Sequence, residues 1–306
     1  MIKLSPKKRG LILALLAGLS IFGAISDASA QIKVDLALRR ALFIRYEPVV
    51  ATVTITNLTG NNLQLADVDN HKWFSFHIEN ADGELVPPYN VDYNLDPVEI
   101  PPGASIKRSV DITPLYPISE FGTYRIRATV YDQTTGHYFS SMPPLNIEVT
   151  EGQLLWQQTV GVPEGSGDGK SRTVSLLSFR LPDTEDLYLR IEDKDSGIIY
   201  CTHQLGRTLS FSKPQVELDP QNQVHVLQGI APRQFIYTHV DLNGKVLERK
   251  EYDGSERSRP MLARNTDGSI AVRGGLYVDA EAQAKTAAAA TPTPGAGERP
   301  VPVPKD

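Results

Sequence analysis

The fold class of the first half of the chain is indicated by the stretch Glu120-Phe121-Gly122-Thr123-Tyr124-Arg125-Ile126-Arg127-Ala128-Thr129-Val130. From Tyr124 to Val130 an apolar residue occupies every second position, and arginine or threonine stands between. Successive side chains of a β-strand point to opposite faces of the sheet. The pattern therefore predicts a strand with one buried face and one solvent-facing face.

Further runs between residues 31 and 151 repeat this period of two. In Val49–Thr56 every residue except Ala51 is β-branched. The other apolar rows are Ile32, Val34, Leu36 and Leu38; Phe74, Phe76 and Ile78; Ile106, Val110 and Ile112; and Leu145, Ile147 and Val149. Such runs, with turn residues between them, predict an all-β domain of the sandwich type over residues 31–151.

The residues before Tyr124 also resemble the tyrosine corner of immunoglobulin-like domains, in which an acidic-x-small-x-Tyr run leads into the penultimate strand. The resemblance implies an immunoglobulin-like β-sandwich in which the Tyr124 hydroxyl bonds to upstream backbone. It also implies that Ile126 is a core residue opposite Val53 or Ile55, where antibody domains carry their disulfide.

Trp73 stands near the place of the core tryptophan of that family. The domain also resembles bacterial immunoglobulin-like modules attached to exported enzymes and adhesins. It departs from the antibody pattern because it lacks both cysteines, which is common outside antibodies.

Residues 152–279 contain hairpin turns at nearly even spacing. Asn-Gly and Asp-Gly between apolar runs are strong hairpin signals. The turns are Asp195-Ser196-Gly197, Pro220-Gln221-Asn222, Asn243-Gly244 and Asp267-Gly268. The flanking stretches weakly resemble strand pairs of β-propeller blades, but a segment of about 120 residues holds two to three blades, and a closed propeller needs at least four. We therefore expect a second antiparallel β-meander packed as a sandwich, or else a fragment completed by a partner.

The two ends of the chain differ in composition from the middle. Residues 1–30 combine a basic start, an apolar run and Ala28-Ser29-Ala30, which predicts a signal peptide cleaved after Ala30 and a periplasmic or secreted protein. Residues 280–306 are rich in alanine and proline and include Pro300-Val301-Pro302-Val303-Pro304. This composition predicts a disordered tail, with a proline-recognition ligand as the alternative.

Charge and cysteine content limit the class of partner. Removal of residues 1–30 takes away four basic residues and one acidic residue, so the formal net charge of −5 becomes −8. An acidic protein with scattered basic residues is a poor ligand for nucleic acid, and no membrane span is expected in the mature form. Its single cysteine, Cys201, allows no internal disulfide, so we expect cores that are stable without one.

A long connection between Pro87 and Gly103 holds the candidate binding residues Tyr89, Asp92 and Tyr93. Flat aromatic faces beside polar groups suit contact with a carbohydrate or a protein partner. The alternative is that these tyrosines cover the edge of the sandwich.

Signals for metal binding and catalysis are weak, and the sequence nominates no catalytic residue, metal ligand or cofactor. Cys201 and His203 share a strand face and would form a thiol–imidazole or zinc-like site only if joined by His225 or His239. Asp193–Gly197 and Asp67–Asn70 partly match calcium loops, but turn chemistry explains them equally well.

The sequence thus favours an exported, non-catalytic binding or structural protein of the cell envelope, with an unknown protein or carbohydrate partner. The alternative is an exported hydrolase, or an accessory subunit of one, with an unrecognised carboxylate site in the second domain. A third hypothesis is protease inhibition through the loop from Pro87 to Gly103.

Overall fold

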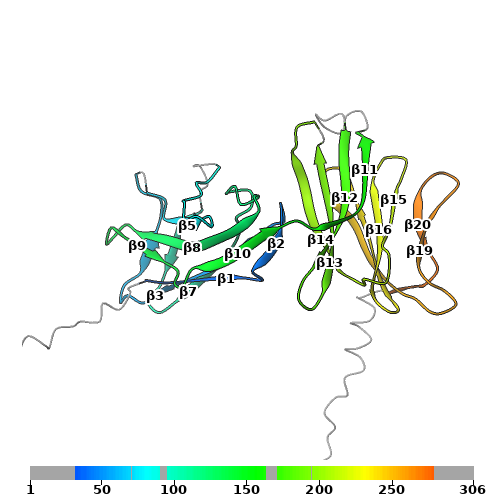
Figure 1. The fold of residues 1–306 in the computed structure, drawn as a ribbon. Coiled ribbons are helices and arrows are strands. Elements are labelled where there is room, and N and C mark those ends of the chain that lie inside the picture. The colour runs from blue at the N-terminus through cyan, green and yellow to red at the C-terminus, as the bar shows by residue number, and fades with distance from the viewer. Residues whose placement is uncertain (1–31, 70, 90–94, 163–170, 194, 279–306) are drawn as a thin grey trace, which may run out of the picture.

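The computed structural model describes residues 32–69, 71–89, 95–162, 171–193 and 195–278. All regular elements in these ranges are β-strands, and they form two domains (Figure 1). The all-β fold class predicted from the sequence is therefore confirmed. No helix within the described ranges is long and apolar enough to cross a membrane.

The first domain has two main sheets. One has the strand order β1-β3-β7, and the other has the order β2-β10-β8-β5 with β9 paired to β8. A short ladder joins β4 to β6. The strands are β1 (Ile32–Leu38), β2 (Leu42–Ile44), β3 (Val50–Asn57), β4 (Leu63–Leu65), β5 (Phe74–Glu79), β6 (Val98–Ile100), β7 (Ser105–Asp111), β8 (Gly122–Asp132), β9 (His137–Ser140) and β10 (Leu145–Thr150). All their ladders are antiparallel except the parallel pair of β2 and β10.

The core of the first domain is built from the alternating apolar positions of these strands. Val53, Ile55 and Ile126 are fully buried in one cluster together with Trp73. The Tyr124 hydroxyl donates a hydrogen bond to the Glu120 carbonyl oxygen at 3.0 Å, as the motif implied.

The second domain consists of two antiparallel meanders and a hairpin. The first sheet has the order β11-β12-β13-β14, the second has the order β15-β16-β17-β18-β21, and β19 pairs with β20. The strands are β11 (Gln153–Gly161), β12 (Ser171–Arg180), β13 (Glu185–Asp193), β14 (Ile199–Thr208), β15 (Gln215–Leu218), β16 (Val224–Ala231), β17 (Gln234–Val240), β18 (Val246–Asp253), β19 (Met261–Arg264), β20 (Ile270–Arg273) and β21 (Leu276–Val278).

These elements are stacked in layers. The two meanders share an apolar core that includes Val174, Leu189, Val226 and Val240. The opposite face of the second meander packs through Leu227, Phe235 and Tyr237 against side chains of the β19–β20 hairpin. The meander predicted from the turn signals is thus present as two sheets packed face to face.

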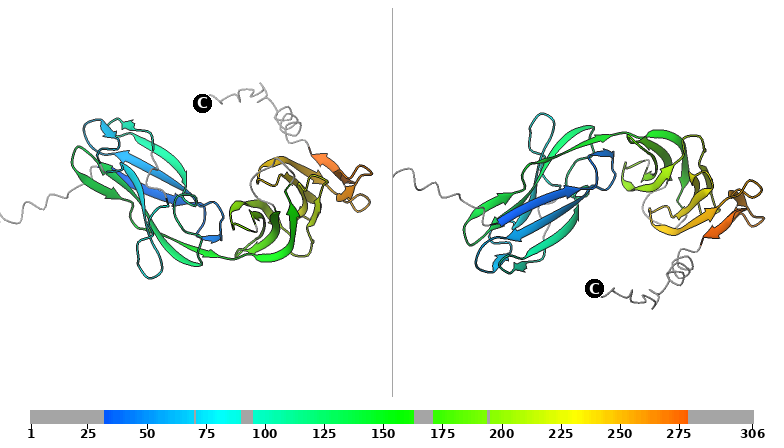
Figure 2. Two further views of the ribbon diagram at one scale, coloured as in Figure 1. Left: turned by 90° about the horizontal axis from the view of Figure 1, so that it is seen from above. Right: turned by 90° about the horizontal axis from the view of Figure 1, so that it is seen from below.

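The two domains lie side by side in both views of Figure 2, and the chain passes from β10 directly into β11. A small cluster joins them, in which Ile44 of β2 packs with Leu177, Phe179 and Tyr188 of the first meander. The Tyr188 hydroxyl accepts a hydrogen bond from Arg40 at 2.8 Å. Contacts between the domains are therefore both apolar and polar.

Candidate metal centre

Two histidines from neighbouring strands form the centre of the candidate site. In the ladder between β16 and β17, His225 is directly opposite His239. On the outer strands, Glu217 of β15 pairs with His225, and Glu248 of β18 pairs with His239. Directly opposed residues on one face of a sheet are close neighbours. The register therefore produces a row of acid, histidine, histidine and acid across the sheet.

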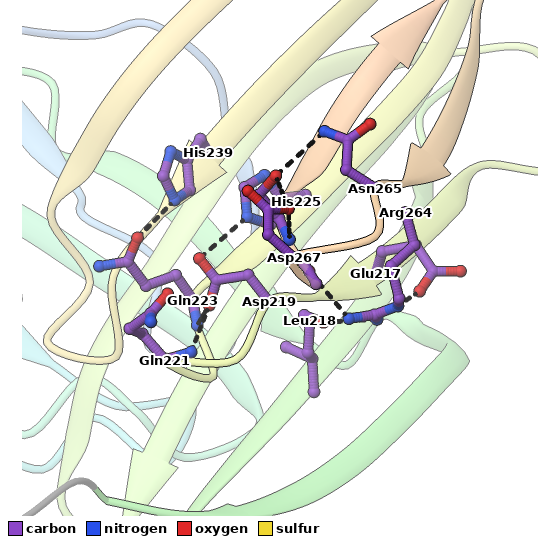
Figure 3. A network of polar contacts seen from close by, with 12 residues as sticks. Glu217, Leu218, Asp219, Gln221, Gln223, His225, His239, Arg264, Asn265 and Asp267 are labelled. Atoms are coloured by element: carbon purple, nitrogen blue, oxygen red, sulfur yellow. Dashed lines mark hydrogen bonds and ion pairs between the residues drawn. The ribbon is translucent and has the colours of Figure 1, made fainter.

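The turn between β15 and β16 adds a carboxylate to this row (Figure 3). Asp219 Oδ1 accepts the backbone N–H groups of Gln221 and Gln223 at 2.9 and 2.8 Å. These two bonds fix the orientation of the carboxylate, whose Oδ2 lies 3.4 Å from His225 Nε2. The same turn residues that close the hairpin thus aim Asp219 at the histidine pair.

Both imidazole rings are held in place by further contacts. The rings of His225 and His239 are stacked, with centroids 4.1 Å apart and an interplanar angle of 16°. His225 Nδ1 lies 2.7 Å from the Tyr237 hydroxyl, and His239 Nε2 lies 2.8 Å from Gln223 Oε1. Both ring nitrogens of His225 and one of His239 therefore have a hydrogen-bond partner, and these contacts restrict the orientation of both rings.

The local electrostatics favour neutral side chains. Burial, followed by the neighbouring His239, lowers the pKa of His225, and the opposing effect of Asp219 is smaller. His225 is therefore a neutral imidazole at pH 7, with one nitrogen that carries a lone pair. Burial also raises the pKa of Tyr237 above its usual value, so this phenol stays protonated and is a poor nucleophile.

Two of the three donor atoms, those of Asp219 and His225, have a spacing that suits a metal ion. One ligand atom from each of Asp219, His225 and His239 lies within 4.8 Å of the other two. Two ligands bound at about 2.1 Å to a tetrahedral zinc ion are about 3.4 Å apart. The separation of 3.4 Å between Asp219 Oδ2 and His225 Nε2 matches that value, and it is long for a hydrogen bond. His239 would have to move by about an ångström or more to complete the set.

Cys201 and His203 do not join this cluster. Cys201 is buried in the core between the meanders, and His203 Nε2 contacts the Gly244 carbonyl oxygen. Within the described residues, the one group of three potential metal ligands is Asp219, His225 and His239. The prediction that Cys201 and His203 could form a site with His225 or His239 is therefore wrong. Cys201 packs in the apolar core, and His203 contacts Gly244 instead.

In the two stretches that partly match calcium loops, carboxylate oxygens already bind groups of the protein itself. Asp193 Oδ1 accepts the N–H groups of Asp195 and Ser196, and its Oδ2 pairs with Arg172 at 2.7 Å. Asp67 accepts the N–H of Trp73 at 2.9 Å, and Asn70 is outside the described residues. Turn chemistry accounts for the Asp193 Oδ1 contacts, and the ion pair with Arg172 and the bond from Trp73 engage the other carboxylate oxygens.

The loop predicted to bind a partner is only partly described. Tyr89 is 63% exposed, and its backbone N–H donates to the Leu115 carbonyl oxygen at 2.8 Å. Asp92 and Tyr93 lie outside the described residues, so their role stays a prediction.

Comparisons with known proteins give little further information. No protein-family model and no curated protein matches the chain. One solved structure found is that of Spo0M, a sporulation control protein from Bacillus subtilis, with 13% sequence identity and a TM-score of 0.27. The alignment covers 56% of this chain and 83% of that chain. A likeness of this degree carries no argument about function.

Proposed function

We propose that the protein is an exported, non-catalytic binding protein whose second domain binds one divalent transition-metal ion through Asp219, His225 and His239. The observation that carries the proposal is the geometry of these donors on three successive elements. Imidazole and carboxylate ligands suit zinc, copper and nickel. Tyr237 would orient His225 from behind, as partners of metal-bound histidines commonly do.

We further propose that the first domain is an immunoglobulin-like module that carries the binding domain. The bond from Tyr124 to the Glu120 carbonyl supports this assignment, as does the fully buried Trp73 directly before β5. The parallel pairing of β2 with β10 beside an otherwise antiparallel sheet is a further supporting feature. The network between Arg40 and Tyr188 then holds the module against the metal-binding domain.

A zinc hydrolase is the second candidate, because two histidines and one carboxylate are also the ligand set of some catalytic zinc sites. Such a site needs a free base to activate water. The two nearest carboxylates in the row are ion-paired: Glu217 with Arg264 at 3.1 Å, and Glu248 with Lys250. This pairing favours binding over catalysis.

Metal titration of the mature full chain tests the proposal. Calorimetry with Zn²⁺ should give one site per chain, and Co²⁺ should give the visible absorption of a four-coordinate ion. His239→Ala and Asp219→Asn should each lower the affinity about 10- to 100-fold or more. Circular dichroism should show that both variants keep the β-fold.

His77→Ala is the matched control, because His77 is an exposed histidine of the first domain that pairs with Glu79 at 3.0 Å. It should leave zinc affinity unchanged. Equal losses in His77→Ala and His239→Ala would show nonspecific binding and refute the site. Zinc-dependent turnover of generic ester or peptide substrates that His239→Ala abolishes would favour the hydrolase.

A further inference from the structure

The second domain has an open groove on the side away from the histidine row. The groove has a volume of about 570 Å³ and lies where the edge strands of the two meanders approach one another. Its apolar lining includes Leu155 and Trp156 of β11, Val216 of β15, and Phe211 and Pro214 of the loop between β14 and β15. Trp156 and Val216 also pack against the core between the meanders. The groove is therefore the open edge of that core.

The loop that forms one wall of the groove is anchored at several points. The Leu209 N–H donates to the Gly229 carbonyl oxygen at 3.1 Å, and the Ser212 N–H donates to the Leu209 carbonyl oxygen at 2.9 Å. Arg259 donates to Ser212 Oγ at 2.9 Å. On this fixed loop the Phe211 side chain is 78% exposed. The groove also has polar lining from residues such as Glu185 and Lys213. A large aromatic ring held in solvent beside a groove of mixed polarity is typical of a binding surface.

Strand β11 forms the other wall, and one bulge is the only one of the common edge protections that its sequence and ladder show. The strand lies at the end of its sheet, and among the residues that the structure describes its one strand partner is β12. Its sequence from Gln153 to Gly161 contains no charged residue and no proline, and Leu154 is 52% exposed. Natural edge strands are commonly shielded by lysine, proline or bulges, and β11 has one bulge between Leu154 and Trp156. Most of β11 is thus available to pair with an added strand.

We propose that the C-terminal segment Arg299–Pro304 of the same chain binds in this groove and pairs with β11. In an extended chain, the N–H groups of alternate residues point to the same edge. In Pro300-Val301-Pro302-Val303-Pro304 the N–H groups of Val301 and Val303 would therefore face β11, and the prolines would leave no donor on the outer edge. The segment would thus end the sheet with an outer edge that carries carbonyl acceptors but no N–H donor from the prolines. Proline rings also suit grooves lined by aromatic residues.

The chain is long enough to reach the groove. The last described residue is Val278 of β21, which lies at the opposite end of its sheet from β15. Four strand intervals separate these two strands, which is about 19 Å at the usual strand spacing. The residues between Val278 and Arg299 can span about 66 Å when fully extended. The intramolecular contact therefore requires no rearrangement of the domain.

Acrylamide quenching of tryptophan fluorescence in the full chain tests the proposal. The chain has two tryptophans; Trp73 is fully buried in the first domain, and Trp156 lines the groove. Trp73 thus adds the same poorly quenched signal to every variant. The variant Val301→Asp with Val303→Asp should raise the quenching constant of the exposed fraction about two-fold, because the apolar segment would leave Trp156.

The control variant is Thr291→Asp with Thr293→Asp, which adds the same charge to the tail outside the docking segment. It should leave quenching unchanged. Equal quenching of Val301→Asp/Val303→Asp and the unmodified chain would refute the proposal, since the tail would then not cover Trp156. Light scattering gives a second outcome that would overturn the proposal. If the unmodified chain has twice the molar mass of one chain and Val301→Asp/Val303→Asp has the mass of one chain, the tail binds the groove of a second copy rather than that of its own chain.

Discussion

At the outer edge of β5, the hydroxyl of Tyr116 takes the hydrogen bonds that a neighbouring strand would otherwise make. Removal of this hydroxyl therefore gives a sharp test of the fold. β5 is the last strand of its sheet, so one edge of β5 faces away from β8. There the Tyr116 hydroxyl donates to the Phe76 carbonyl oxygen at 2.9 Å and accepts the Phe76 N–H at 3.2 Å. Both bonds are buried. One side chain thus satisfies both backbone groups of Phe76.

Tyr116→Phe should lower the free energy of unfolding by about 2 to 3 kcal/mol. Each neutral hydrogen bond contributes about 1 kcal/mol net, and a buried N–H or C=O left without a partner adds to the loss. The phenyl ring would keep the packing against Phe76, whose ring centroid lies 6.2 Å from that of Tyr116. The loss therefore reports the two hydrogen bonds rather than a cavity.

Urea denaturation followed by tryptophan fluorescence measures this loss. In a Trp156→Phe background, Trp73 is the remaining tryptophan and reports the first domain alone. Tyr89→Phe is the control, because the side chain of Tyr89 is 63% exposed and its change should stay within about 0.5 kcal/mol. If Tyr116→Phe lowers the free energy of unfolding no more than Tyr89→Phe does, and the dependence of that free energy on urea concentration is unchanged, the proposed role of the hydroxyl is wrong.

Four further outcomes are expected. Tyr124→Phe should cost about 1 kcal/mol in the same assay, because it removes one partly buried bond, and no loss would count against the immunoglobulin-like assignment. Because burial raises the pKa of Cys201 to about 12, iodoacetamide at pH 8 should label this thiol only after denaturation; labelling of the native protein would contradict its burial. N-terminal sequencing of the native protein should begin at Gln31, and an intact leader would refute export with cleavage. Replacement of Tyr89 and Tyr93 together by alanine should weaken capture of a native partner by about 2 kcal/mol with little change in stability. If the double variant binds as well as the unmodified chain, the alternative that these tyrosines only cover the edge of the sandwich is correct.

The strands could be predicted from the sequence because each carries its own local signal. The alternation from Tyr124 to Val130 lies within β8, and the run Val49–Thr56 overlaps β3 closely. Asn243-Gly244 lies between β17 and β18, as expected. In contrast, β2 has only three residues, and its parallel pairing with β10 and its contacts with the second domain depend on distant parts of the chain. No local pattern encodes such contacts.

The histidine pair could not be predicted because its register depends on a bulge. Near the turn, Ala231 pairs with Gln234, and a regular ladder continued from that pair would place His225 opposite Val240. The irregularity between Gly229 and Ala231 shifts the register by one residue, so that His225 meets His239 instead. A one-residue slip moves a side chain to a different partner and face, and bulges commonly re-aim side chains at functional sites. The extra residue, Ile230, therefore brings the two imidazoles together. Regular strands without this bulge would place His225 opposite Val240 and keep the two histidines apart.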